Sequence, residues 1–275
     1  MKLGFALIGI CVAAWGEGKP RLVLNAVTVP DARFGARTLF AGFAAALVAV
    51  PFGLILFLVE DRWAPLSSVD GGARDGLHGV VLHHEGLVTA LKVLSTIGSA
   101  VVYFPLFAAV AAWLVWRRLP RLALFVVVTV GGSALLNAVV KAIVHRARPV
   151  VADPVAHAAG MSFPSGHAQS AVVAWSVLLL VFLPALPRGW RMPAVLAAVA
   201  MVLAIGFARV ALGVHFVSDV LAGYVLGAAW TAAMIAAFNT WRRESGKPPV
   251  HPAHGLEPHH EKRLAGTAPL RRDPT

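Results

Sequence analysis

The chain of 275 residues is too apolar for a soluble domain, since hydrophobic residues make up 58% of it, charged residues 13%, and the mean hydropathy is +0.75. The net charge of +11 does not indicate a nucleic-acid-binding protein, because the Lys and Arg residues gather at the ends of apolar runs and near the C-terminus, where anionic lipid headgroups attract them. The single cysteine, Cys11, excludes a disulfide within one chain. We therefore interpret the chain as an integral membrane protein.

The N-terminal part begins with an apolar run at residues 3–15, which is shorter than the roughly 20 residues that a membrane-spanning helix needs. Two interpretations stay open, a cleaved signal segment and an interfacial segment, and no Ala-x-Ala cleavage pattern follows the run. A basic linker with two prolines comes next. We assign residues 1–37 to a cytoplasmic N-terminal segment.

Six later runs are apolar and long enough to cross a bilayer as helices. The sequence therefore predicts an all-α fold, an integral membrane helical bundle with about six transmembrane helices. The predicted spans are residues 38–59, 98–116, 122–144, 168–186, 193–212 and 216–238.

The segment between the first two spans is polar and rich in glycine, which predicts a loop over residues 60–86. His78, His83 and His84 invite a metal-binding interpretation, but no cysteine or carboxylate stands at a ligand spacing, and we expect no metal. Residues 87–97 predict a short amphipathic helix that leads into the second span.

The basic residues predict the orientation of the bundle. Short connections rich in arginine remain in the cytoplasm, so we expect both termini inside and the protein in the plasma membrane as a multi-pass protein. Residues 38–243 form the membrane domain, and residues 244–275, which lack apolar periodicity, are expected to be a disordered basic cytoplasmic tail. The arginines that carry this prediction are Arg117, Arg118, Arg121, Arg188, Arg191, Arg242 and Arg243.

Three polar clusters interrupt the apolar runs, and the alternation of spans places all three at the external or periplasmic membrane face. The first is Lys141, six residues, then Arg148-Pro149; the second is Pro-Ser165-Gly166-His167; the third begins at Arg209. Unpaired cations in hydrocarbon cost several kcal/mol, so we expect these charges to converge on an anion, most simply a phosphate. The third cluster continues with His215 and Asp219.

The cations of these clusters suit the three oxygens of a phosphoryl group in transfer. Arg148 and Arg209 can make forked contacts and Lys141 acts as a point charge. Lys141 and Arg148, seven residues apart, share a face of one helix, and Pro149 ends that helix so that Arg148 lies at its mouth. Lipid-headgroup contacts would be the simpler explanation for any one of these residues taken alone.

The second cluster precedes an apolar helix, so Ser165 and Gly166 can form a phosphate-binding cap and present His167. An ordinary serine N-cap with an incidental histidine is the alternative. In the third cluster, His215 and Asp219 stand at i and i+4, where a carboxylate can orient the imidazole. We expect His215 to be the nucleophile and His167 the general acid and base.

The three clusters together resemble the signature of the type 2 phosphatidic acid phosphatase superfamily, membrane lipid phosphatases related to the soluble vanadium haloperoxidases. The resemblance covers about residues 90 to 240 and every charged position of the signature; it departs at Ala208, where the family has a serine, so a hydroxyl near the phosphate is expected to be absent. It implies the catalytic residues His215, His167 and Asp219. The phosphate-binding residues that it implies are Lys141, Arg148, Ser165, Gly166 and Arg209.

The resemblance implies a membrane lipid phosphatase that hydrolyses a phosphate monoester or pyrophosphate through a phosphohistidine intermediate, without metal or other cofactor. Phosphatidic acid, phosphatidylglycerophosphate and polyprenyl pyrophosphate offer the same reacting group. A phosphotransferase with the same intermediate and a non-enzymatic membrane transporter are the alternatives. The expected partners are a lipid phosphate and membrane lipids, and the oligomeric state stays open. Four further residues are candidates to support the site or bind the headgroup: His145, Arg146, Asp153 and His157.

Overall fold

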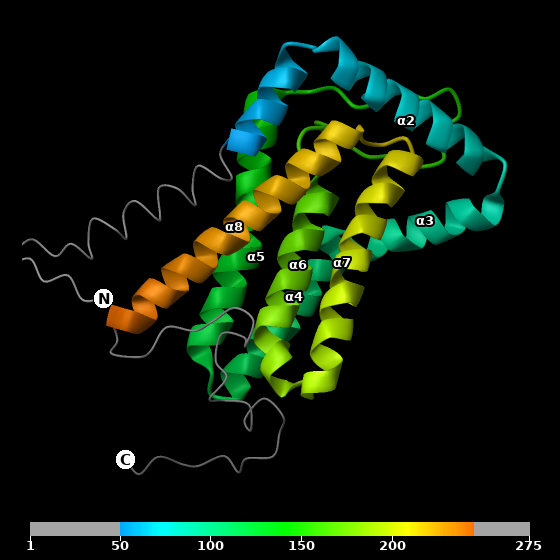
Figure 1. The fold of residues 1–275 in the computed structure, drawn as a ribbon. Coiled ribbons are helices and arrows are strands. Elements are labelled where there is room, and N and C mark those ends of the chain that lie inside the picture. The colour runs from blue at the N-terminus through cyan, green and yellow to red at the C-terminus, as the bar shows by residue number, and fades with distance from the viewer. Residues whose placement is uncertain (1–49, 245–275) are drawn as a thin grey trace, which may run out of the picture. The chain divides into compact units, whose positions relative to one another are not determined.

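The computed structural model describes residues 50–244, and every regular element in that range is helical (Figure 1). An apolar helical segment, Val50–Glu60, comes first. The helices that follow are α2 (Ala64–Leu82), α3 (Glu85–Ile97), α4 (Ala100–Trp116), α5 (Pro120–Val144), α6 (Gly166–Phe182), α7 (Arg188–Ala211) and α8 (Val217–Glu244), with a 3-10 turn, η1 (Leu183–Ala185), after α6. The predicted all-α fold is confirmed for this range.

The number of membrane spans differs from the six predicted. Four helices of the described range, α5, α6 with η1, α7 and α8, are long and apolar enough to cross a bilayer. α3 and α4 together make a fifth only if the pair, bent by 41°, is one broken span. The predicted span at residues 38–59 lies mostly outside the described residues, as do the N-terminal segment and, beyond Glu244, the tail.

α6 is the central helix of the bundle: 56% of its apolar window is buried, against 28% to 39% in the other three. Its core face includes Val173 and Val177, which pack with Leu114 of α4 and Val126 of α5. Tight burial of these side chains stabilises the arrangement in which α6 contacts α4, α5, α7 and α8.

Two glycines allow α8 to lie directly against α6. A Cβ at Gly223 would stand 2.6 Å from the carbonyl oxygen of Ser165, and one at Gly227 would stand 2.8 Å from that of Gln169. Glycines four residues apart on one face are a common device for close contact between membrane helices. This contact brings the start of α8, which carries Asp219, beside the start of α6.

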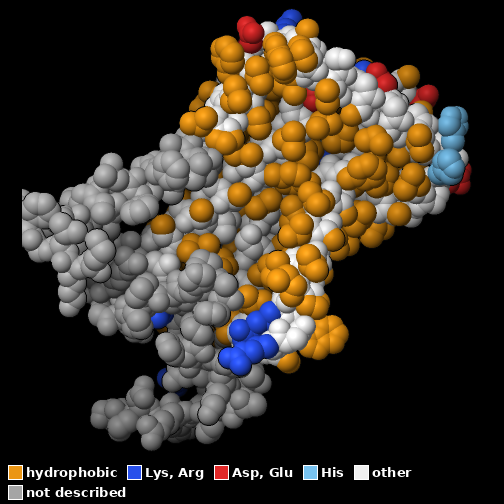
Figure 2. All heavy atoms as spheres, in the orientation of Figure 1, with side chains coloured by type: hydrophobic (Ala, Val, Ile, Leu, Met, Phe, Trp, Pro, Cys, Tyr) orange, Lys and Arg blue, Asp and Glu red, His pale blue; other side chains and the backbone are white. Residues whose placement is uncertain are grey.

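The outer surface of the bundle is strongly apolar, as Figure 2 shows for one face. Along α7 the side chains of Met192, Leu196, Val199, Leu203 and Phe207 are exposed at spacings of three or four residues, so they form one stripe. In a membrane protein such a stripe faces acyl chains rather than water.

The predicted loop at residues 60–86 is wrong, because most of it is α2, which lies across the end of the bundle where α5 joins α6 and α7 joins α8 (Figure 1). The reason lies in its inward face, where Asp70 and His78 are buried together with Val81. A search for apolar periodicity overlooks a helix that buries polar side chains, and four glycines weaken its helix propensity further. The adjoining helix predicted at residues 87–97 is confirmed as α3.

A second correction concerns the end of α5. The helix ends at Val144 rather than at Arg148, because His145 adopts a left-handed conformation with a φ of 50° and its amide closes the last turn on Lys141. Lys141 is therefore helical, whereas Arg148 lies in the extended segment that follows.

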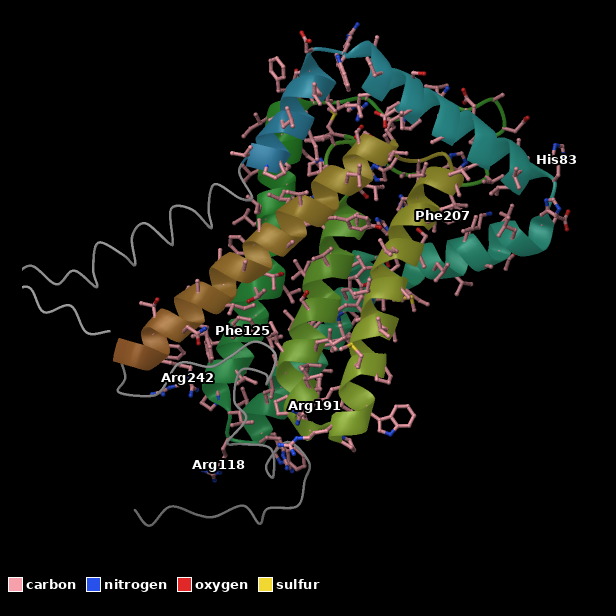
Figure 3. The ribbon with its side chains drawn as sticks, in the orientation of Figure 1. His83, Arg118, Phe125, Arg191, Phe207 and Arg242 are labelled. Carbon is pink, nitrogen blue, oxygen red and sulfur yellow. The ribbon has the colours of Figure 1, made fainter. Side chains whose placement is uncertain are left out.

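The arginines that predicted the orientation lie at one end of the bundle. Figure 3 shows Arg118, Arg191 and Arg242 at the end opposite to α2. The three polar clusters lie at the α2 end. The two groups of charges are thus separated by the length of the apolar helices, as the alternation of spans predicted.

Candidate active site

The three polar clusters meet at one cavity of roughly 600 Å³ at the α2 end of the bundle. The first contributes residues from the end of α5 and the segment after it, the second from the start of α6, and the third from the end of α7 and the turn before α8. Of the predicted site residues, those that line the cavity are Lys141, Arg148, Gly166, His167, Arg209 and His215.

His215 and Asp219 are in contact, as predicted, across 3.3 Å between Nδ1 and Oδ2. His215 lies just before α8, not within it. The same Oδ2 accepts hydrogen bonds from the amide of Phe216 and the hydroxyl of Ser162, at 2.9 and 2.5 Å. Asp219 therefore caps its own helix and holds the imidazole with one oxygen.

The contacts of His215 define its tautomer. Nε2 lies 3.1 Å from a terminal nitrogen of Arg148, and a guanidinium can only donate, so Nε2 is the acceptor and Nδ1 carries the proton toward Asp219. Burial lowers the pKa of His215 to about 4; Asp219 opposes this shift, and Arg148 and Arg209 add to it. The ring is thus neutral near pH 7, and the lone pair of Nε2 accepts the hydrogen bond of Arg148 at the cavity.

Arg148 lines the cavity and hydrogen-bonds to several segments around it. Its guanidinium donates to the carbonyl oxygens of Ala159, Gly160 and Val214 at 2.9 to 3.0 Å, in addition to His215. Partial burial lowers the pKa of Arg148, and Asp219 opposes the shift. The side chain joins the segment before α6 to the turn before α8, so its position depends on both.

The other two cations are more available to an anion. Lys141 donates to the carbonyl oxygen of Met161 at 2.5 Å through one of its three N–H groups. Arg209 donates to the hydroxyl of Ser95 in α3, also at 2.5 Å, while its buried Nε has no hydrogen-bond partner in the described part of the chain. Arg209 lines the cavity, and its unpaired Nε is a donor that a ligand could satisfy.

The second cluster begins α6 as predicted. Ser165 is the N-cap, its hydroxyl accepts from the amide of Ala168 at 3.4 Å, and its own amide donates to the carbonyl oxygen of Asp219. Gly166 and His167, the first two residues of α6, line the cavity, so the positive end of the helix dipole lies beside it. His167 makes no hydrogen bond to any described residue.

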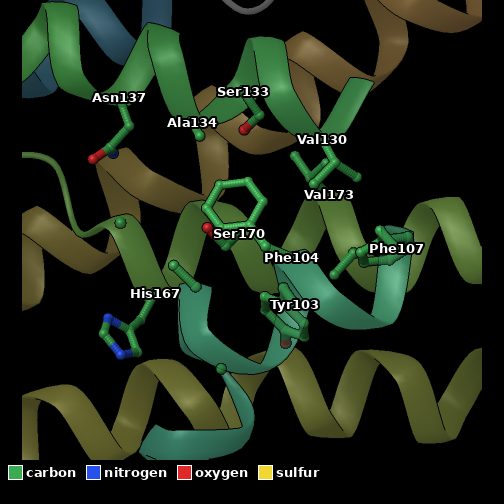
Figure 4. A pocket seen from close by; sticks show the side chains of 14 residues that line it. Tyr103, Phe104, Phe107, Val130, Ser133, Ala134, Asn137, His167, Ser170 and Val173 are labelled. Carbon is green, nitrogen blue, oxygen red and sulfur yellow. The ribbon is translucent and has the colours of Figure 1, made fainter. Parts of the chain in front are cut away.

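His167 also lines a second, apolar pocket of about 200 Å³ between α4, α5 and α6. Figure 4 shows His167 and Asn137 at one end of this pocket and Phe107, Val130 and Val173 at the other. The imidazole thus separates a cationic cavity from a hydrophobic one.

The structure places Ala208 away from the cavity. Its side chain is fully buried in an apolar cluster with Val81 of α2 and Leu91 of α3, and it does not line the cavity. A hydroxyl at this position would enter that cluster. The hydroxyl that contacts Arg209 comes instead from Ser95, which the sequence did not indicate because α3 is far away along the chain.

The remaining candidates separate into two groups. Arg146 forms an ion pair with Asp219 at 2.6 Å, and His157 lines the cavity. His145 is exposed and bonds to the carbonyl oxygen of Ile143, while Asp153 uses its carbonyl oxygen to accept from His78. Contact of any of them with a headgroup stays a prediction.

Sequence reasoning missed three residues of the site besides Ser95. Ser162, Ser218 and Asp70 are buried around Asp219 and Arg146. The only signal of Ser162 and Ser218 was a polar residue beside a recognised cluster, which many loop residues share, and Asp70 lies in the segment predicted to be a loop. Among the described residues no group of three or more His, Cys, Asp or Glu side chains is placed to hold a metal ion, and the two ring nitrogens of His78 lie near carbonyl oxygens.

Comparison with known proteins gives consistent results. The sequence profile of the PAP2 superfamily matches residues 122–243. The chain is 34% identical over 151 residues to phosphatidylglycerophosphatase B of Bacillus subtilis. The aligned segment covers 54% of this chain and 73% of that protein. The crystal structure of the transmembrane PAP2 type phosphatidylglycerolphosphate phosphatase from Bacillus subtilis has the same fold, with a TM-score of 0.65 and 24% identity over 73% of this chain and 98% of the other. From its profile match and its identity to a curated member, this chain belongs to the PAP2 superfamily.

Proposed function

We propose that the protein is a membrane lipid phosphatase that hydrolyses a phosphate monoester or pyrophosphate of a lipid. One observation carries the proposal: His167 lies between the cationic cavity and the apolar pocket. A phosphate in the first and an acyl or prenyl chain directed to the second would place the scissile oxygen beside this imidazole. The relative from Bacillus subtilis, named a phosphatidylglycerophosphatase, makes phosphatidylglycerophosphate the first substrate to test.

In the proposed reaction the lone pair on Nε2 of His215 attacks phosphorus while the bond from phosphorus to the lipid oxygen breaks. His167 donates a proton to that oxygen, so a monoester leaves as a lipid alcohol; with a pyrophosphate the bridging oxygen leaves instead, as part of a lipid monophosphate. Asp219 stabilises the positive charge that develops on the ring of His215. Water then attacks the phosphohistidine, His167 accepts its proton, the phosphorus–nitrogen bond breaks, and inorganic phosphate leaves.

The cations stabilise the transferring group without a metal ion in this proposal. Lys141, Arg148, Arg209 and the first amides of α6 surround one cavity, so several donors meet the equatorial oxygens at once. Arg209 contributes its unpaired Nε. The site would open at the external membrane face, because the arginine-rich end of the bundle is expected inside.

The test is phosphate release by the purified protein from a panel of lipid phosphates of one headgroup and two chain lengths, with and without EDTA. We expect the long-chain lipid to have the higher kcat/KM and EDTA to have no effect. Equal efficiency for a soluble sugar phosphate, or activity that EDTA abolishes and a divalent cation restores, contradicts the proposal. Transfer of phosphate to an added alcohol in preference to water would identify a phosphotransferase.

A matched pair of variants tests the apolar pocket. Ala134 lines the pocket, whereas Ala138, one turn later in α5, is exposed. Ala134→Phe should fill the pocket and lower kcat/KM for the long-chain lipid about tenfold or more, with a smaller effect on the short-chain analogue. Ala138→Phe should leave both unchanged. Equal losses for both lipids in Ala134→Phe would mean that the chain binds elsewhere.

A further inference from the structure

Asp70 of α2 is a buried carboxylate at the end of the bundle that carries the site, with a relative exposure of 2%. Oδ1 accepts a hydrogen bond from the amide of Ser218 at 2.9 Å, and Oδ2 accepts one from the hydroxyl of the same residue at 2.5 Å. Oδ2 also forms an ion pair with Arg146 at 2.9 Å. Asp70 thus joins α2 to the first turn of α8 and to the segment after α5.

Arg146 connects Asp70 to the proposed active site. One terminal nitrogen contacts Asp70, and the other donates to Oδ1 of Asp219 at 2.6 Å and to the hydroxyl of Ser218 at 2.7 Å. The guanidinium also lies 4.3 Å from the ring centroid of Phe216, the residue after His215. The contacts therefore run without interruption from Asp70 through Arg146 and Asp219 to the imidazole.

The charges along this chain of contacts alternate in sign. Arg146 lies between two buried carboxylates, so each of them has only a share of its positive charge. Asp219 contacts Arg146 through Oδ1 and His215 through Oδ2. The negative charge of Asp219 that acts on the imidazole therefore depends on how strongly Arg146 also pairs with Asp70. Asp70 is the second carboxylate that forms an ion pair with Arg146.

A second contact of α2 fixes the same region. His78, two turns after Asp70, directs its ring nitrogens to the carbonyl oxygens of Ala211 and Asp153, at 3.4 and 2.9 Å. The inward face of α2 therefore contacts the segments before α6 and before α8, which both contribute to the cavity. A helix held in this way is a rigid support for a catalytic pair.

We propose that Asp70 is a positioning residue for the reaction: through Arg146 it sets the orientation of the Asp219 carboxylate and the electrostatic environment of His215. The inference rests on the proposed function, in which His215 is the nucleophile. α2, which sequence reasoning took for a loop, is on this proposal a part of the active site.

The proposal predicts the direction in which the pKa of His215 changes in two variants. A mere loss of packing predicts no such direction. The charged and titratable groups around His215 are Arg148 before α6, His167 of α6, Arg209 of α7 and Asp219 of α8. Asp70→Asn removes one of the two carboxylates of Arg146, so that Arg146 pairs with Asp219 alone, and the lost negative charge should lower the pKa of His215. Arg146→Gln removes that charge and should raise it.

The experiment compares Asp70→Asn and Arg146→Gln with Asp75→Asn in detergent-solubilised full-length protein. Asp75 is a matched control, because it lies on the same helix but is exposed and forms its ion pair with its neighbour Arg74. The first readout is the titration of His215 by NMR of histidine-labelled protein, assigned with His215→Asn. We expect shifts of about half a pH unit or more, in opposite directions for the first two variants, and none for the control.

The second readout is kinetic. Asp70→Asn should lower kcat about tenfold or more with KM changed less than threefold, because it disturbs the orientation of the pair and not the cationic cavity. Asp70→Glu, which keeps the charge, should recover part of the loss. Thermal unfolding of each variant separates these effects from a loss of folding.

The outcomes separate the two proposals. If the wild-type protein releases no phosphate from any lipid, the proposed function fails, and the NMR shifts still test the link from Asp70 to His215. If the wild type is active while Asp70→Asn matches Asp75→Asn in kcat and in the His215 titration, the inference fails and the proposed function stands. Shifts of the same sign in Asp70→Asn and Arg146→Gln also overturn it.

Discussion

The guanidinium of Arg148 donates to Nε2 of His215 across 3.1 Å, although 67 residues separate the two along the chain. This contact joins the first polar cluster to the third and occupies the nitrogen that faces the cavity. In the proposed reaction an entering phosphate takes over part of the Arg148 hydrogen bonding, which leaves the lone pair of His215 directed at phosphorus. In the proposed function Arg148 thus both joins the segments of the site and binds the anion.

Arg148→Lys keeps the charge but loses the fork that reaches Ala159, Gly160, Val214 and His215. We expect kcat/KM for the lipid phosphate to fall about a hundredfold or more. Arg188→Lys, an exposed position at the opposite end of the bundle, is the control and should retain full activity. Steady-state phosphate release decides; near wild-type activity in Arg148→Lys would show that charge alone suffices.

The two histidines should respond differently to replacement. His215→Ala should abolish turnover and the trapped phosphoenzyme, because the attacking nitrogen is gone. His167→Ala should recover part of its phosphorylation step with a substrate whose leaving group is acidic, because that oxygen needs no proton. Acid quenching and detection of acid-labile, base-stable phosphate measure both. Phosphoenzyme that persists in His215→Ala would assign the nucleophile to another residue.

Ser95 and Ala208 allow a test of which hydroxyl supports Arg209. Ser95→Ala removes the contact at 2.5 Å and leaves a buried donor unpaired, so we expect kcat/KM to fall about tenfold. Ala208→Ser puts a hydroxyl into the apolar cluster of Val81 and Leu91, so it should lower the melting temperature without raising activity. Ser67→Ala, exposed on α2, is the control. Higher activity in Ala208→Ser would show that the family hydroxyl reaches the phosphate after all.

The lowered pKa of His215 predicts a wide acid range of activity. The ring must be neutral to attack; its pKa of about 4 lies below the ordinary value of about 6.5, so kcat/KM should hold as pH falls through 6.5 and decline only as it nears 4. The same lowered pKa should also make the folded protein less stable at acid pH. The unfolded chain takes up this proton near pH 6.5 and the folded chain only near 4, so stability decreases as pH falls between them. Activity and unfolding measurements from pH 4 to 8, with His215→Asn as the reference for unfolding, test both signs.

The orientation predicts which ends of the bundle react with an impermeant thiol reagent. In a Cys11→Ser background, a cysteine at Asp153, in the segment before α6, should react from outside, and one at Gly189, in the first turn of α7, should be protected. Labelling of intact cells before and after permeabilisation measures this. The reverse pattern would put the site in the cytoplasm.

Several features of the fold and site could be predicted from local sequence. α4 to α8 are long apolar runs, and the bilayer demands helices of that length with every backbone group paired. The side-chain contact of His215 with Asp219 and the Ser165 cap of α6 were also predictable, because both depend on residues at most four positions apart. The alternation of spans was enough to bring the three clusters to one end.

Other features depended on contacts between distant residues, which no local pattern records. α2 is a helix because Asp70 and His78 find buried partners up to 148 residues away, and polar residues on an inward face look like a loop in the sequence. For the same reason the sequence did not reveal that Ser95 contacts Arg209 or that Arg146 lies beside two carboxylates. The sequence by itself therefore determined the long apolar helices and the three polar clusters that meet at one cavity. Only the tertiary structure decided which buried partners orient those groups, because that depends on how helices far apart in the chain pack together.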